Sequence, residues 1–352
     1  MLNQNGTSDT ELILKRVLPI MNRRNSIKAA FISLFSCHLA VSGDQPISAE
    51  ELKILEISLQ DKDQSSLILP GTKLEKLWDK GEFTEGGAEG PDGSIYFSDI
   101  GNELMKFDPK TGLVSEYRNP SGRSNGTIFD ARGRLIAAEG ANIGGNRRIT
   151  ATDLKTGKVE VLADNYQGKK FNSPNDVAVD AAGRVYFSDP RYVGNEPREL
   201  DFEAVFRIDP DSTVTRLNTG AYKPNGLVVS PDGKTLYVAD NGGQRRVLLA
   251  CDLDSNGNTK PGRVLYDFGD GRGIDGMTVT TDGLIVATAG KDDKAGIWIF
   301  DPAGKVRGMI PTPEAPANCE FGGPGASTLY IMAGVSLYRI QTKMHGYKLF
   351  PG

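Results

Sequence analysis

The chain has 352 residues, with 41 Lys and Arg against 45 Asp and Glu and a formal net charge of -4 that is spread along its length. No basic stripe indicates a nucleic-acid partner, and no acidic tail stands out. The only two histidines, His38 and His345, leave almost nothing for a Ser-His-Asp triad or a His-based zinc site. The three cysteines, Cys37, Cys251 and Cys319, lack metal-ligand spacing.

Residues 1–45 are predicted to be a leader segment. Arg23-Arg24 precede an apolar run from Ala29 to Gly43, which is typical of a removable export signal and too short for a membrane-spanning helix. We therefore expect an exported protein of the periplasm or cell envelope, with no membrane span in the mature chain. The arginine pair resembles a twin-arginine signal, and Cys37 stands in a lipobox-like sequence; a buried or interfacial N-terminal helix is the alternative. Residues 46–71 are assigned to an N-terminal extension.

Six related segments follow, each with two short apolar stretches joined by a turn that is rich in Gly and polar residues. They are Phe83–Ile100, Ser124–Gly140, Ser173–Pro190, Lys223–Gly243, Gly273–Gly290 and Ala317–Gly334. Every segment is followed by sequence typical of a third strand, and all but the last by a fourth. Repeats of four antiparallel strands without long amphipathic helices predict an all-β, six-bladed β-propeller over residues 72–345.

The sixth segment lacks a fourth strand before the chain ends. The stretch at residues 73–79 has the composition to supply it, so we expect the N- and C-terminal strands to pair and close the ring. Residues 346–352 are then a C-terminal tail.

Equivalent points of the first five segments carry an acidic or amide residue, at steps of 40, 50, 50 and 50 residues. This rim series comprises Glu85, Asn125, Asn175, Asn225 and Asp275. Because equivalent points of successive blades meet at one end of a propeller, these side chains should share one rim. Carboxylate and amide oxygens suit a hard divalent cation, and the lack of His and thiolate ligands argues against zinc and copper. The alternative is that the Asn-Gly and Asp-Gly pairs are only turn formers.

A second series of acidic residues falls 14 or 15 positions further on, at the end of the second strand of each hairpin. It comprises Asp99, Glu139, Asp189 and Asp240, with Ala289 in the fifth segment. Together with Asn125, the last three of these acids form a candidate substrate pocket. The alternative is structural, because carboxylates at such positions often accept backbone N–H groups in loops.

The aligned segments resemble the SMP-30/gluconolactonase family, also called regucalcin-like, over about residues 72–342. The motifs occur in the family's order: FTEG at Phe83–Gly86, SNG at Ser124–Gly126, SPNDVAVD at Ser173–Asp180, PNGL at Pro224–Leu227 and DGM at Asp275–Met277. The resemblance implies a divalent metal held by Glu85, Asn225 and Asp275, with Asn175 at the metal and in contact with substrate. It also implies that Asp275 is the general base.

With this resemblance, we expect a divalent-metal-dependent lactonase that hydrolyses a sugar lactone such as an aldonolactone. The metal would polarise the carbonyl, and Asp275 or metal-bound water would activate the nucleophile. Ca2+ is the expected ion, with Mg2+, Mn2+ and Zn2+ left open. A phosphotriesterase-like hydrolase on the same scaffold and a non-enzymatic binding propeller held together by the ion are the alternatives. The sequence indicates no oligomeric state.

Overall fold

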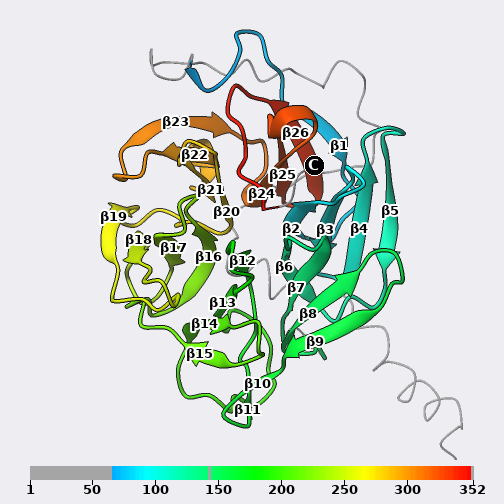
Figure 1. Cartoon of the computed structure of the whole chain (residues 1–352). Helices are drawn as coiled ribbons and strands as arrows, with labels where there is room; N and C mark the ends of the chain where they lie inside the picture. Colours follow the sequence, from blue (N-terminus) through cyan, green and yellow to red (C-terminus); the bar gives the residue numbers. More distant parts are fainter. Residues whose placement is uncertain (1–65, 142–143, 350–352) are drawn as a thin grey trace, which may run out of the picture. The chain divides into compact units, whose positions relative to one another are not determined.

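The computed structural model describes residues 66–141 and 144–349. They form six antiparallel sheets of four strands each, arranged as blades around a common centre (Figure 1). The predicted six-bladed β-propeller is therefore confirmed. The predicted leader, residues 1–45, and most of the N-terminal extension lie outside the described residues.

The first three blades each run from an inner to an outer strand in chain order. Blade 1 consists of β2 (Thr84–Glu89), β3 (Ile95–Asp99), β4 (Glu103–Asp108) and β5 (Leu113–Arg118); blade 2 of β6 (Ser124–Phe129), β7 (Arg134–Glu139), β8 (Arg148–Asp153) and β9 (Val159–Ala163); blade 3 of β12 (Val177–Val179), β13 (Val185–Asp189), β14 (Ala204–Ile208) and β15 (Val214–Arg216). A hairpin of β10 (Asn165–Tyr166) and β11 (Lys169–Lys170) lies between blades 2 and 3 in the sequence.

The remaining blades repeat this order, except that the last borrows its outer strand from the start of the fold. Blade 4 consists of β16 (Pro224–Val229), β17 (Thr235–Asp240), β18 (Val247–Asp252) and β19 (Arg263–Asp267); blade 5 of β20 (Met277–Val279), β21 (Ile285–Ala289), β22 (Gly296–Phe300) and β23 (Val306–Pro311); blade 6 of β24 (Pro316–Gly322), β25 (Thr328–Ala333), β26 (Ser336–Gln341) and β1 (Glu75–Trp78). Short 3-10 helices in the described part of the chain include η2 (Asp292–Lys294) and η3 (Pro324–Ala326). Within the described ranges, no helix is long and apolar enough to span a membrane.

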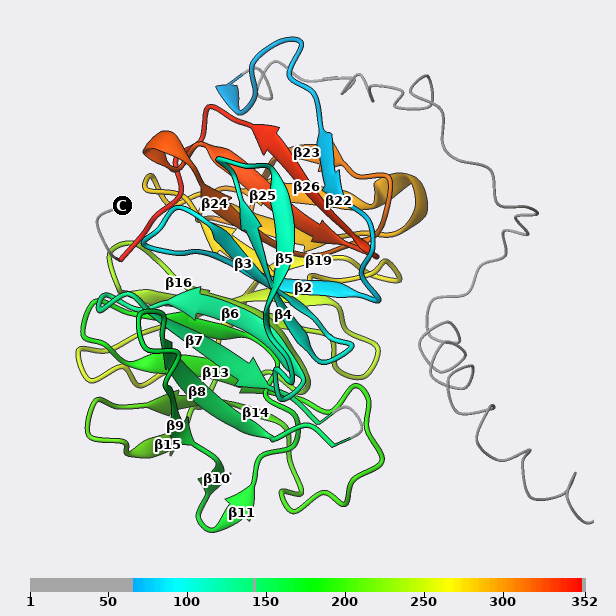
Figure 2. The same ribbon diagram turned by 90° about the vertical axis from the view of Figure 1, so that its right-hand side faces the viewer.

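The ring closes where β1 pairs antiparallel with β26, with Glu75 opposite Arg339. These two side chains form an ion pair at 2.7 Å, and the Trp78 ring packs edge-on against Phe97 of blade 1 with centroids 5.7 Å apart. Figure 2 shows the blue N-terminal strand beside the red C-terminal blade. The expected pairing of the first and last strands is thus confirmed.

Inner strands are buried because neighbouring blades cover both of their faces. Every residue of β12, β16 and β20 is buried, whereas none of the outer strand β19 is. A strand that is covered on both faces reads as a continuous run of apolar and small residues instead of an alternating pattern. Polar residues at the start of such strands therefore need partners at the end of the blade.

The turns between inner and second strands lie at the opposite end of the blades from the rim series. In blade 4 this turn contains Asp232 and Gly233, the latter with φ +69°. The Asp232 carboxylate accepts the Ser230 hydroxyl at 2.7 Å and the Lys234 N–H at 3.1 Å. The Pro-Asp-Gly pattern therefore marks this face, as expected of turn formers.

The C-terminal tail crosses the centre of the same face. The Thr281 N–H donates to the His345 carbonyl at 2.8 Å, and the Tyr347 N–H donates to the Val279 carbonyl at 2.9 Å, so the tail runs beside blade 5. The Lys348 ammonium then forms an ion pair with Glu89 at the end of β2 in blade 1. The tail thereby closes this end of the central channel.

Removing the Trp78 ring should weaken the closure of the propeller. Trp78→Ala deletes a half-buried aromatic contact between β1 and blade 1, so we expect a loss of about 2–3 kcal/mol in the free energy of unfolding, below the value for a fully buried ring. Urea denaturation measures this loss. Val161→Ala on the exposed outer strand β9 is the control and should change stability by about 0.5 kcal/mol or less. Equal effects of the two substitutions would contradict the assigned role of β1.

Candidate functional site

The rim series lies at one end of the central channel, where the inner strands begin. Glu85, Asn125 and Asn225 are the second residues of β2, β6 and β16, and Asn175 and Asp275 stand two residues before β12 and β20. The structure therefore places these five residues at equivalent points of five successive blades. Their common end is the one that faces away from the C-terminal tail.

Backbone hydrogen bonds tie neighbouring members of the rim series together. The Gly126 N–H donates to the Asn175 carbonyl, and the Gly226 N–H donates to the Asp275 carbonyl, each at 2.7 Å. A Cβ atom at Gly226 would overlap the Asp275 carbonyl oxygen. Glycine follows these rim residues because adjacent inner strands approach closely here. The Asn-Gly pairs lie inside strands β6 and β16, so the turn-former alternative does not account for them.

Three members of the rim series converge on one polar cluster. The Asn225 Nδ2 donates to Asp275 Oδ1 at 2.7 Å, so its own Oδ1 stays available as a neutral acceptor. Glu85 is buried, and burial together with the nearby charges of Asp275 and Asp176 raises its pKa well above the ordinary value. The cluster therefore concentrates negative charge where water is largely excluded.

Asp176 belongs to this cluster although the sequence analysis did not select it. Its Oδ1 accepts the Val177 N–H at 2.9 Å and its Oδ2 accepts the Leu227 N–H at 3.3 Å. Burial raises its pKa to about 7. A signal was present in the sequence, because Asp176 follows Asn175 where the other four rim residues are each followed by glycine.

Arg272 supplies the positive charge nearest to Asp275. Its Nη2 lies 2.5 Å from Asp275 Oδ2, and its Nη1 donates to the Pro316 carbonyl at 2.8 Å. The guanidinium is thus fixed between blades 5 and 6. The sequence repeat does not predict this role of Arg272, because no other segment carries an arginine three residues before its rim residue.

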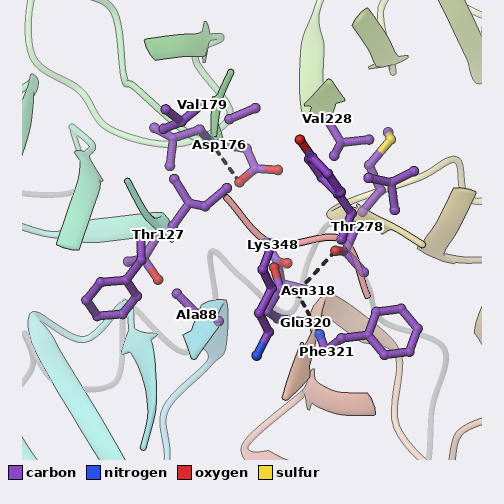
Figure 3. Close-up of a pocket in the computed structure, with 18 of the residues that line it drawn as sticks. Ala88, Thr127, Asp176, Val179, Val228, Thr278, Asn318, Glu320, Phe321 and Lys348 are labelled. Carbon is purple, nitrogen blue, oxygen red and sulfur yellow. Dashed lines mark hydrogen bonds between the residues drawn. The ribbon is translucent and has the colours of Figure 1, made fainter. Parts of the chain in front are cut away.

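The rest of the channel is narrow, and its largely apolar wall carries the buried carboxyls of Asp176 and Glu320 (Figure 3). It encloses about 60 Å3, far below the roughly 300–1,000 Å3 of ordinary ligand pockets. Asp176, Glu320 and Lys348 surround the same cavity. Glu320 Oε1 accepts the Phe321 N–H at 2.7 Å and the Thr278 hydroxyl at 3.2 Å, and burial raises its pKa to about 8. Burial also lowers the pKa of Lys348 to about 8.

The donor set fits a hard divalent cation. In the described part of the chain, no three His, Cys, Asp or Glu side chains converge closely enough to hold a metal ion by themselves. The rim cluster instead combines the carboxylates of Glu85 and Asp275 with the amide oxygen of Asn225, and Asn175 adds a second amide at the same end. Oxygen donors of both kinds are those that Ca2+ and Mg2+ prefer, and a cation would offset the repulsion that raises the Glu85 pKa.

The second series of acids holds the loops that enter the inner strands. Asp99, Asp189 and Asp240 each accept the N–H groups of two consecutive residues in such a loop. The donor pairs are Glu82 and Phe83, Asn172 and Ser173, and Tyr222 and Lys223, respectively. These bonds fit the structural alternative for Asp189 and Asp240. The predicted place of these two residues in a substrate pocket stays a prediction.

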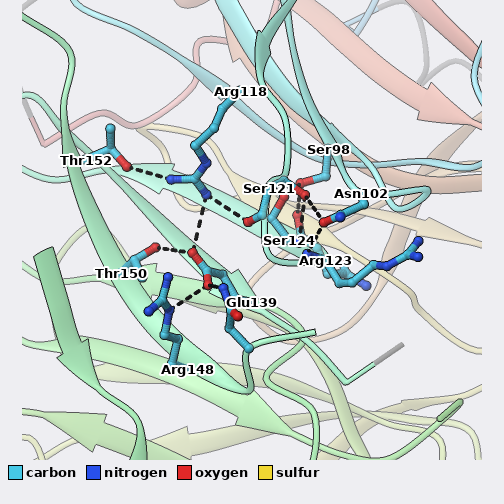
Figure 4. Close-up of polar contacts among 12 residues, drawn as sticks. Ser98, Asn102, Arg118, Ser121, Arg123, Ser124, Glu139, Arg148, Thr150 and Thr152 are labelled. Atoms are coloured by element: carbon cyan, nitrogen blue, oxygen red, sulfur yellow. Dashed lines mark hydrogen bonds and ion pairs between the residues drawn. The ribbon is translucent and has the colours of Figure 1, made fainter. Parts of the chain in front are cut away.

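Glu139 instead lies in an ion-pair network (Figure 4). Its carboxylate accepts Arg148 Nε at 2.7 Å and Arg118 Nη2 at 3.4 Å. Asn146 Nδ2 at 2.6 Å and the Thr150 hydroxyl at 3.1 Å add two further donors. Since both carboxylate oxygens are engaged by blades 1 and 2, Glu139 also fits the structural alternative.

Asn125 remains a residue of the rim. Its backbone carbonyl accepts the Ser98 hydroxyl at 2.7 Å, which joins blade 2 to blade 1. The side chain is half-buried at the same end as Asn175 and Asn225. Its predicted place in a substrate pocket stays a prediction.

A long loop from residue 190 to residue 203 adds Tyr192 to the wall of the site. The Tyr192 hydroxyl donates to the Lys223 carbonyl at 3.4 Å, and the Lys223 ammonium lies 4.6 Å from the centre of the tyrosine ring. Tyr192 is 36 % exposed, yet burial of its phenol and the charge of Asp275 raise its pKa. The hydroxyl thus contacts the backbone of Lys223, two residues before the rim residue Asn225. Because this loop has no counterpart of equal length in other blades, the repeat could not predict it.

Known proteins resemble this chain both in sequence and in structure. The sequence pattern of a family described as "SMP-30/Gluconolactonase/LRE-like region" matches residues 83–334. A gluconolactonase from Zymomonas mobilis is 30 % identical over 93 % of this chain and 99 % of its own length. The solved structure of a gluconolactonase from Xanthomonas campestris is 28 % identical with a TM-score of 0.72, covering 80 % of this chain and 93 % of that one. Regucalcin of Agrobacterium tumefaciens, a calcium-binding protein, shares the fold at 18 % identity, with a TM-score of 0.65 over 78 % of this chain and 96 % of that one.

The buried Glu320 carboxyl should make the metal-free protein less stable at alkaline pH. Its folded-state pKa of about 8 lies above the ordinary 4.5, so its contribution to stability is complete below about pH 4.5 and is lost as the pH rises through 8. Glu320→Gln keeps both accepted hydrogen bonds but cannot ionise. We expect the variant to equal the native protein near pH 4.5 and to be more stable by a few kcal/mol above pH 8.

Urea denaturation in the presence of EDTA at the two pH values measures this difference. Glu116→Gln on the exposed strand β5 is the matched control and should show no pH-dependent gain. A gain of equal size at both pH values would exclude ionisation of Glu320 as its cause.

Proposed function

The chain belongs to the SMP-30/gluconolactonase/LRE-like family, and we propose that it is a divalent-metal-dependent lactonase that hydrolyses a sugar lactone. The observation that carries the proposal is the convergence of Glu85, Asn225 and Asp275 at one end of the channel. The relatives named above as gluconolactonases support the reaction class. The fold alone would not, because propellers host many activities.

The ion would be held by the oxygen atoms of Glu85, Asn175, Asn225 and Asp275. When bound there, a divalent cation polarises the lactone carbonyl and stabilises the negative charge that develops on its oxygen. We propose Ca2+, because all of the donors are oxygens and two of them are neutral. The calcium-binding regucalcin of A. tumefaciens supports this choice only through the shared fold.

Asp275 is the residue best placed to act as general base. Asn225 Nδ2 from the neighbouring blade 4 and Arg272 Nη2 from the segment that precedes β20 fix its two oxygens, so the carboxylate is oriented before substrate arrives. In the proposed step, a water oxygen attacks the carbonyl carbon and its proton passes to Asp275. The ring C–O bond then breaks, and the leaving oxygen takes that proton back to give the open hydroxy acid. Arg272 offsets negative charge beside the reacting carbonyl.

Substrate should enter from the rim. The tail residues Tyr347, Lys348 and Leu349 line the far end of the channel, and the channel encloses only about 60 Å3. A sugar ring therefore has to bind on the rim side of Asp275, between the loops that precede the inner strands. We also propose that the protein is exported, which rests on the predicted leader sequence alone.

Chelation tests the metal. We expect EDTA to abolish hydrolysis of D-glucono-1,5-lactone, followed by acid release in a pH-stat, while far-UV circular dichroism stays unchanged. Adding back Ca2+, Mg2+, Mn2+ or Zn2+ one at a time identifies the active ion. If EDTA melts the protein and no lactone or ester is ever cleaved, the molecule is a binding propeller stabilised by an ion.

Asp275→Asn tests the base. The amide keeps an oxygen donor but cannot take a proton, so we expect kcat to fall by about a hundred- to ten-thousand-fold. Asp282→Asn is the control, because Asp282 lies in the turn at the other end of the same blade and should keep full activity. Full lactonase activity of Asp275→Asn with metal still bound would refute the assignment.

A further inference from the structure

Two basic side chains on the rim are left without an acidic partner. Arg123 Nη1 donates to the backbone carbonyls of Ile100 and Gly101 at 3.2 and 2.7 Å. The Lys223 ammonium rests over the Tyr192 ring at 4.6 Å. In the part of the chain that the structure describes, no carboxylate lies within ion-pair distance of either cation. By contrast, Arg148 and Arg245 on the same face are paired with Glu139 and Asp240.

Arg123 and Lys223 occupy equivalent positions of blades 2 and 4. Each stands two residues before a member of the rim series. The Arg123 carbonyl accepts the Gly140 N–H at 2.8 Å, and the Lys223 carbonyl accepts the Asn241 N–H at 3.0 Å. In both blades that donor directly follows an acid of the second series. The backbone of Arg123 and that of Lys223 therefore lie at equivalent points of the rim in blades 2 and 4. Figure 4 shows the Arg123 side chain directed away from Glu139.

Tyr192 holds the Lys223 ammonium in place. Its hydroxyl bonds to the Lys223 backbone while its ring lies under the Lys223 charge. A cation held over an aromatic face loses less conformational freedom when it binds a ligand than a free lysine does. Lys223 stands two residues before Asn225, whose Nδ2 donates to Asp275 Oδ1 at 2.7 Å, so this wall lies beside the proposed base.

The charged groups at the rim sum to a net positive charge when the proposed ion is bound. With the ion of the proposed function bound, the three carboxylates of Glu85, Asp176 and Asp275 are balanced by the ion and Arg272. Arg123 and Lys223 remain uncompensated next to this neutral centre. Such a surface attracts an anion, and the attraction should weaken with salt.

We propose that the natural substrate is an anionic sugar lactone, with a carboxylate or phosphate on the carbon chain outside the lactone ring. Lys223 binds that anion, and Arg123 reinforces the attraction from blade 2. The proposal rests on the proposed lactonase function and adds the substrate class to it. The carbonyl end of the substrate lies at Asp275, and the anionic end lies towards Tyr192 and Lys223.

Two matched pairs of lactones test this. D-galactono-1,4-lactone and D-galactaro-1,4-lactone differ only in a terminal carboxylate, and D-glucono-1,5-lactone and its 6-phosphate differ only in a phosphate. We expect the native protein to show a kcat/KM at least about tenfold higher for the anionic member of one pair at low salt, equivalent to one charge-assisted hydrogen bond. The pair that shows the preference identifies the anion.

Variants assign the preference to residues. Lys223→Met should remove most of it by raising KM for the anionic lactone by a larger factor than KM for the neutral lactone, and far-UV circular dichroism checks that the variant is folded. Arg123→Met should reduce it independently. Tyr192→Phe keeps the ring and should keep the preference, whereas Tyr192→Leu should lose it. Lys234→Met, an exposed lysine in the turn at the other end of blade 4, is the matched control.

The outcomes separate this proposal from the function on which it rests. If neutral lactones are hydrolysed as well as the anionic ones, or if Lys223→Met affects both members of a pair alike, the anionic substrate is refuted and the lactonase stands. If the metal-loaded protein cleaves no lactone of either kind, the lactonase itself fails, and the substrate class fails with it.

Discussion

Neighbouring inner strands of this propeller approach closely enough to form backbone hydrogen bonds, and this contact governs where each functional side chain lies. The bonds from Gly126 to Asn175 and from Gly226 to Asp275 join each of these glycines to a rim residue one blade further on. Since a rim residue stands directly before each glycine, every such bond fixes two rim side chains relative to one another. The site is therefore built on strand ends, which hold side chains more accurately than loops do. Substituting the glycine would change the geometry of two blades at once.

The axis of the molecule is polar in an otherwise apolar core. Glu85, Asp176 and Glu320 are buried carboxyls whose pKa values are raised by burial, which is unfavourable for the folded state in the absence of a cation. At the far end of the channel, the tail brings Lys348 to Glu89. Proteins tend to keep such locally unfavourable arrangements at functional sites. Positive charge from Arg272 at one end and Lys348 at the other partly offsets the negative charge of the axis.

The periodic features of this protein could be predicted from sequence, and the irregular ones could not. Four strands per repeat and the composition of residues 73–79 were sufficient to predict the fold, including the closure of the ring by pairing of β1 with β26. The rim series followed from spacing alone because a propeller brings equivalent positions together. Asp176 was overlooked because it replaces a glycine whose role appears only when two strands are seen side by side. Arg272 and Tyr192 come from segments that do not repeat, so no comparison between blades could reveal them.

Closure of the ring by β1 also has a consequence for how the chain folds. The side chains of Glu75 and Arg339, which are 264 residues apart, meet in one sheet, so β1 stays unpaired until β26 has been synthesised and blade 6 can be completed. Until then β26 keeps an unpaired edge, and the chain remains an open arc that could pair with another copy. Contacts of such long sequence separation slow folding, because a large loop must close before they form. A nascent chain can fold its blades in succession as it emerges from the ribosome, but it can complete the propeller only after β26 has emerged.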